Sequence, residues 1–177
     1  TKKHPNDVMM AETFAASLAE FGEQEEAIAA LKRAAMLSPN EGYEKFMYLG
    51  QLLDDGEAAT MCTRQGLAIL EAQARAGDED AQGQHASACC ALAEQILGTA
   101  DEMDDETGAQ VEELINRARA SDPASPEPLQ LLASLKNEQG KSDEALAVLK
   151  ESMEMWRRGA MHREGDDSHE AEEFQNE

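Results

Sequence analysis

Residues 129–152, LQLLASLKNEQGKSDEALAVLKES, decide the fold of this chain. Apolar residues three and four apart lie on one side of a helix, and a glycine between two such runs ends the first helix and starts a turn. The spaced positions are Leu129, Leu132, Ala133, Gly140, Ala145, Leu149 and Ser152. A helical hairpin of this kind buries its apolar side only against another hairpin, so the stretch predicts a stacked repeat.

The spacing is that of the tetratricopeptide repeat, a helix pair with a period of about 34 residues. Comparable hairpins are predicted over residues 7–37, 43–76 and 80–122, before the last at 126–158. Residues 98–106 read as an insertion in the third hairpin, because its turn is longer than the consensus. We expect an all-α, right-handed superhelical solenoid of about four hairpins over residues 7–158. Residues 159–177 are acidic and aperiodic, and we expect them to be flexible unless Ala171 and Phe174 belong to a further capping helix.

The composition independently favours helices. Val and Ile together number seven among 177 residues, whereas Ala, Leu, Met, Glu, Gln and Lys are abundant. Such a mixture disfavours strands and suits helices. Cys62, Cys89 and Cys90 fall within predicted helices and read as small packing residues of a chain in a reducing, intracellular setting. Neither a membrane span of about 20 apolar residues nor a signal peptide is expected.

The net charge of −22 narrows the class of partner. Residues 159–177 hold one Arg and seven carboxylates, which leaves about −16 on the repeats. Direct binding of DNA or RNA is not expected, because such binding depends on Lys and Arg displacing counterions. A spread negative field instead attracts basic polypeptides. The alternative is an acidic surface that only keeps the protein soluble.

No motif in the chain indicates catalysis or a cofactor. His85 and Cys89 share a helix face and could ligate zinc, but no second ligand pair is present, so packing is the preferred interpretation. The acidic loop at 101–106 lacks the alternating ligands, the central glycine and the final glutamate of a calcium loop. No phosphate loop, nucleophile elbow or catalytic triad is found. We therefore expect a protein that is not an enzyme and needs no metal or cofactor.

Repeat geometry predicts a binding surface on the first helices, which line the inner concave groove of such solenoids. The exposed positions on these first helices lie opposite the packing residues. They comprise the residues given at the end of this paragraph together with Ser87 and Ser134. Because these positions are mostly acidic or polar, a groove for acidic peptides, which needs Lys, Arg and Asn, is excluded. The alternative is that these are only solvated helix faces, with the true contact elsewhere. The predicted partner-binding residues are Glu44, Met47, Gln51 and Asp54 in the second hairpin, Cys90, Glu94 and Leu97 in the third, and Glu127, Gln130 and Asn137 in the fourth.

Three stretches carry a more specific resemblance: residues 43–53 (YEKFMYLGQLL), 85–94 (HASACCALAE), and 114–135 together with 140–156. They resemble the fungal tetratricopeptide chaperones dedicated to a newly made ribosomal protein, protein four of the large subunit. The resemblance implies a non-enzymatic chaperone of cytoplasm and nucleus. Such a chaperone captures a long basic loop of its client, shields it and escorts it to pre-ribosomes; the resemblance sets no oligomeric state.

In that setting, Glu44, Asp54, Glu94 and Glu127 are expected to pair with the charges of the client, while Met47 and Leu97 contact its apolar residues. The alternative function is a generic tetratricopeptide scaffold or adaptor that holds folded partners together.

Overall fold

The computed structural model describes Thr13, residues 23–100 and residues 102–173 of the chain. Within these residues every regular element is a helix, so the all-α prediction is confirmed. The expected first helix at 7–21 lies outside the described residues. None of the described helices is both long and apolar enough to cross a membrane. The helices are α2 (Gln24–Leu37), α3 (Glu44–Leu52), α4 (Gly56–Arg75), α5 (Glu79–Thr99), α6 (Asp105–Ser121), α7 (Glu127–Glu138) and α8 (Ser142–Glu173).

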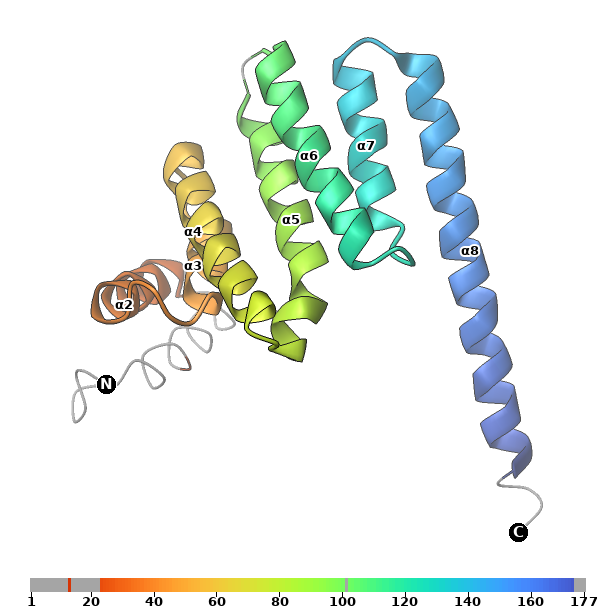
Figure 1. Ribbon diagram of the computed structural model, residues 1–177, viewed down its shortest axis with the longest axis horizontal. Helices are drawn as coiled ribbons and strands as arrows, with labels where there is room; N and C mark the ends of the chain where they lie inside the picture. The colour runs from red at the N-terminus through yellow and green to blue at the C-terminus, as the bar shows by residue number, and fades with distance from the viewer. Residues whose placement is uncertain (1–12, 14–22, 101, 174–177) are drawn as a thin grey trace.

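The helices follow one another as antiparallel pairs along the molecule, with α8 projecting furthest at the C-terminal end (Figure 1). The pairs are α3 with α4, α5 with α6, and α7 with α8, as the repeat spacing predicts. Each pair also packs on the next one, since α4 contacts α5 and α6 contacts α7. This serial packing of neighbours is what defines a solenoid.

Aspartates start three of these helices. The side chains of Asp55, Asp78 and Asp104 each accept a hydrogen bond from the backbone N–H three residues later, at 3.0, 3.1 and 2.7 Å. They satisfy donors that the first turn of a helix leaves free, and their charge suits the positive helix start. Gly77 and Gly140 follow α4 and α7 with φ of +95° and +71°, the left-handed conformation that glycine adopts at little cost.

The main core lies between α4, α5, α6 and α7 and is built mostly from Leu, Ile, Ala and Cys. Small residues let the helices approach closely. A side chain at Gly50 of α3 would collide with Oγ1 of Thr63 on α4. The backbone oxygen of Gly50 accepts a hydrogen bond of 2.7 Å from Nε2 of Gln95, which ties α3 to α5. Gly50 therefore allows a close approach of α3 to α4.

Two helix ends differ from the sequence-based limits. Helix α5 continues to Thr99 and α6 starts at Asp105, so the insertion predicted at 98–106 shrinks to residues 100–104. The end expected near Arg158 is also wrong, because the backbone of α8 stays helical to Glu173. Residues 159–173 contain no proline, and their Ala, Met, Glu and Arg favour a helix even though Gly159 and Gly165 disfavour it.

One side of α8 carries exposed apolar residues. Leu149 was expected to pack, yet its side chain is 41% exposed. Of the described helices, α7 packs extensively on α8, and the apolar residues on this side of α8 stay exposed. We call Leu146, Leu149, Met153 and Trp156 the α8 stripe; they lie three or four residues apart and are 41 to 65% exposed.

Candidate partner-binding face

The exposed sides of α3, α5 and α7 form one surface, which we call the first-helix face. Contacts between α5 and α7 and the Gln95–Gly50 hydrogen bond hold the three helices together. The face carries Glu44, Met47 and Gln51 from α3, Glu94 and Leu97 from α5, and Glu127, Gln130 and Asn137 from α7. Apart from half-buried Met47 and Leu97, all of these side chains are exposed.

The prediction for Cys90 is wrong. Its side chain is 1% exposed and belongs to the main core. Burial first, then Glu127, Cys89 and Glu94, raise the pKa of the Cys90 thiol to about 12. The physical reason is that α7 packs against α5 and covers this position, which an isolated helix would leave open.

Two other predicted positions lie differently than expected. Asp54 is exposed but is not on a helix, because α3 ends at Leu52 and Leu53 is extended. It therefore stands in the turn at the edge of the first-helix face. Leu97 is half-buried against the main core, so only part of its side chain can meet a partner.

Glu94 and Glu127 bring two negative charges together between α5 and α7. Partial burial and then the charge of Glu94 raise the pKa of the Glu127 carboxyl. Both causes penalise its ionised form. A cationic ligand placed between the two carboxylates would relieve this repulsion.

No Lys or Arg among the described residues neutralises the carboxylates of this surface. Within the described residues, Glu44, Asp54, Glu94 and Glu127 have no ion pair. The Lys and Arg side chains that do form ion pairs hold Glu71, Glu112 and Glu154 instead. The first-helix face therefore keeps an uncompensated negative charge.

A hollow of about 250 Å³ lies between α3 and α5 on this face. The predicted residues Glu44, Met47, Gln51 and Ser87 line it, which confirms that they share one surface. Tyr43 and Tyr48 also line it, and sequence reasoning missed both. The repeat offsets omit their positions; the tyrosines beside Glu44 and Met47 were the available signal. We call this site the α3–α5 hollow; its lining residues are Tyr43, Glu44, Met47, Tyr48, Gln51, Gln84, Ser87 and Ala88.

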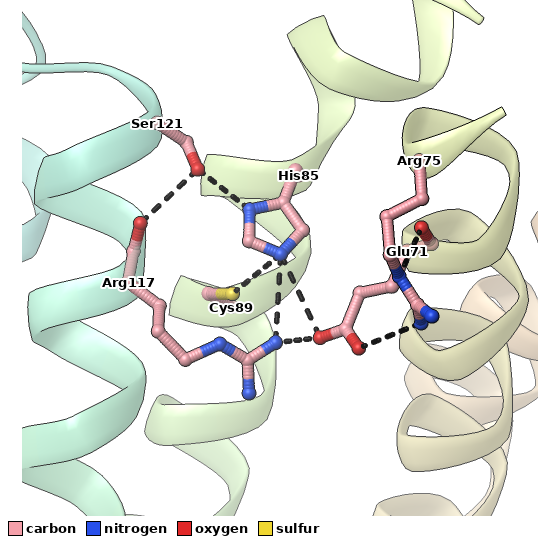
Figure 2. Close-up of polar contacts among 6 residues, drawn as sticks. All are labelled: Glu71, Arg75, His85, Cys89, Arg117 and Ser121. Atoms are coloured by element: carbon pink, nitrogen blue, oxygen red, sulfur yellow. Dashed lines mark hydrogen bonds and ion pairs between the residues drawn. The ribbon is translucent and has the colours of Figure 1, made fainter. Parts of the chain in front are cut away.

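The other side of α5 holds a polar cluster that joins α4, α5 and α6 (Figure 2). Arg117 of α6 forms an ion pair with Glu71 of α4. Between them, Nδ1 of His85 lies 2.6 Å from Oγ of Ser121, and Nε2 lies 3.7 Å from Sγ of Cys89. The cluster thus links α4 to α6, two helices that belong to different hairpins.

This cluster does not have the properties of a catalytic or metal site. Burial raises the pKa of the Cys89 thiol to about 12 and lowers the pKa of His85, so thiol and imidazole are neutral at pH 7. A neutral thiol is a poor nucleophile. No group of three or more His, Cys, Asp or Glu in the described part of the chain could hold a metal ion. Packing and cross-helix hydrogen bonding account for His85 and Cys89.

No family model matches the chain. It is 30% identical over 133 residues to a "Probable assembly chaperone of rpl4" from Schizosaccharomyces pombe, an alignment that covers 74% of this chain and 39% of the relative. The chain therefore spans about two fifths of the length of this relative.

Two solved structures share the fold. The assembly chaperone of RpL4 (Acl4) superposes with a TM-score of 0.75 at 22% identity, over 86% of this chain and 63% of that one. MamA superposes with a TM-score of 0.72 at 18% identity, over 90% of this chain and 84% of that one. The chain is thus an all-α solenoid of the tetratricopeptide type, and its predicted resemblance to the fungal assembly chaperones of Rpl4 is confirmed.

Proposed function

We propose that this chain is a chaperone whose first-helix face captures a basic, unfolded segment of newly made ribosomal protein four of the large subunit. The observation that carries the proposal is the set of carboxylates at Glu44, Asp54, Glu94 and Glu127, which have no ion pair among the described residues. The name of the fission-yeast relative supports the choice of client.

The negative charge of the first-helix face favours a basic ligand. Segments of ribosomal proteins that bind rRNA are rich in Lys and Arg and lack structure before assembly. Two carboxylates that repel each other, such as Glu94 and Glu127, gain from every cation placed beside them. Half-buried Met47 and Leu97 offer apolar contact between the charges. The face would shield the client by occupying the charges that otherwise bind nucleic acid.

The remaining parts of the proposal follow from this role. Holding a client requires no catalysis and no cofactor. A net charge of −22 disfavours direct contact with nucleic acid. A chaperone that meets its client after synthesis and delivers it to pre-ribosomes would work in both cytoplasm and nucleus, through an extended loop of the client and without a membrane.

A scaffold or adaptor is the second candidate function, and the α8 stripe favours it. Leu146, Met153 and Trp156 are 52, 65 and 61% exposed. Apolar residues gathered on one helix side often mark contact with another folded surface. A scaffold would use this stripe to hold a folded partner, whereas a chaperone would use the first-helix face.

Co-expression with the basic ribosomal protein separates the two functions. A chaperone should raise the soluble yield of the client, and the variant E44K/E94K should abolish the gain. By calorimetry, E44K/E94K should weaken binding about tenfold at low salt, as expected for two exposed charge pairs turned into repulsions. Added salt should reduce the difference.

The control is E113K/E151K, which changes the net charge equally but on α6 and α8, where both residues are exposed. It should bind the client nearly as well as the parent chain. If the two variants lose affinity equally, only the overall charge matters and the first-helix face is not the binding surface. An unchanged client yield together with co-purification of a folded complex would favour the scaffold.

A further inference from the structure

We propose that the α3–α5 hollow seats one arginine side chain of the bound segment and prefers arginine to lysine there. The inference rests on the proposed function, because it assumes that a basic segment lies on the first-helix face. It adds a defined anchor point and a preference between the two basic residues, neither of which follows from net charge.

The walls and rim of the hollow differ in chemistry. Tyr43, Met47 and Tyr48 supply two rings and a thioether; Tyr48 is 41% exposed, so its ring is open to a ligand. Glu44, Gln51, Gln84 and Ser87 supply oxygens. Within the described residues, none of these polar side chains has a hydrogen bond or an ion pair. The hollow thus offers aromatic surface beside several free acceptors.

The described residues that line the hollow carry a net negative charge. They include the carboxylate of Glu44 and no Lys or Arg. Burial first, and then the charges of Glu44, Asp78 and Asp80, raise the pKa of Tyr43. These carboxylates belong to both α3 and the start of α5, so negative charge reaches the hollow from two elements. An anionic group is excluded and a cation is attracted.

The size of the hollow fits one side chain. The hollow holds about 250 Å³. A long side chain reaching in from an extended backbone fits this volume.

Arginine matches this lining better than lysine does. Its planar guanidinium stacks on aromatic rings and directs several N–H donors to separate acceptors. A lysine ammonium is compact and strongly hydrated, so it loses more hydration on entering a partly apolar hollow. A site with carboxylate and amide oxygens around two tyrosines therefore favours arginine over lysine.

Two Gly/Ser-rich peptides, identical except for four Arg or four Lys at the same positions, provide the test. Calorimetry with the whole chain should give about five- to tenfold tighter binding of the Arg peptide. Y48L should abolish the preference while binding of the Lys peptide stays within about twofold. E44Q should also abolish the preference but weaken binding of both peptides, because it removes a charge of the first-helix face as well. Y48F keeps the ring and should keep the preference.

The site of binding can be read from ¹³C-labelled methionine methyl groups. The Met47 methyl should shift on addition of the Arg peptide, whereas Met61, 66% exposed on α4, should not. Equal affinity for the two peptides, or a preference that survives Y48L, overturns the anchor but leaves the acidic face as a binding surface. If neither peptide binds, both the anchor and the attraction of basic segments fail.

Discussion

Replacing Gly50 with alanine tests how closely α3 and α4 must approach to form the first-helix face. A Cβ at this position would collide with Oγ1 of Thr63. It would also lie 3.2 Å from Nε2 of Gln95 and 3.3 Å from the backbone oxygen of Ala59. Thr63 is 1% exposed and hydrogen-bonds within its own helix at 3.2 Å, so it has little room to move. Helix α3 would have to shift away from α4.

The expected magnitude follows from two opposing effects. Overpacking a buried contact costs about 1 to 3 kcal/mol, and three close neighbours place Gly50 near the upper value. Alanine regains about 1 kcal/mol of helix propensity over glycine. The net loss should be about 2 kcal/mol, or roughly 4 to 8 °C in melting temperature for a chain of this size. Urea and thermal unfolding followed by circular dichroism at 222 nm would measure it.

Two further variants make the test specific. G50A/T63A removes the hydroxyl that the new methyl meets, so the double variant should be more stable than the sum of the single changes by at least about 1 kcal/mol. In G83A the new methyl meets nothing within 4 Å, and helix propensity should stabilise that variant by about 0.5 to 1 kcal/mol. If G50A equals the parent in stability, or if T63A gives no rescue, the close approach at Gly50 does not constrain the helices.

Three other outcomes are expected. Because the pKa of Glu127 is raised, ionisation destabilises the free fold as pH rises through that pKa, so E127Q should stabilise the unbound protein at pH 7. Over the same pH range the affinity of the parent chain for basic peptides should rise more steeply than that of E127Q. Cys89 and Cys90, with thiol pKa values of about 12, should react with Ellman's reagent at pH 8 only after urea unfolding; reaction in the folded state would refute their burial. R117M should lower the free energy of unfolding by about 1 kcal/mol, since it removes the partly screened pair with Glu71; a smaller loss in an E71Q background would confirm the coupling.

Local spacing was enough to predict most of the fold. Leu129, Ala133 and Ala145 are buried where the repeat pattern places them, and Gly140 has the positive φ of a turn. Such positions depend on contacts inside one hairpin, so periodicity along the chain determines them. The acidity of the first-helix face could also be predicted from the sequence, because the sign of a side chain's charge follows from the residue type.

Contacts between hairpins could not be predicted in this way. Cys90 occupies a groove position by spacing, yet α7 covers it, and Leu149 occupies a packing position, yet its side chain stays exposed. The ion pair of Glu71 with Arg117 could not be predicted either, nor could the place of Tyr43 and Tyr48 in the α3–α5 hollow. Both depend on how far neighbouring helices lie apart and where each helix ends.

The sequence by itself therefore determined which residues form helices, which side of each helix is apolar, and the sign of the charge on the first-helix face. Only the tertiary structure decided which exposed positions stay open and which are joined into a hollow. The physical reason is that periodicity records the direction of a side chain from its own helix axis, whereas burial depends on the distance to the next helix.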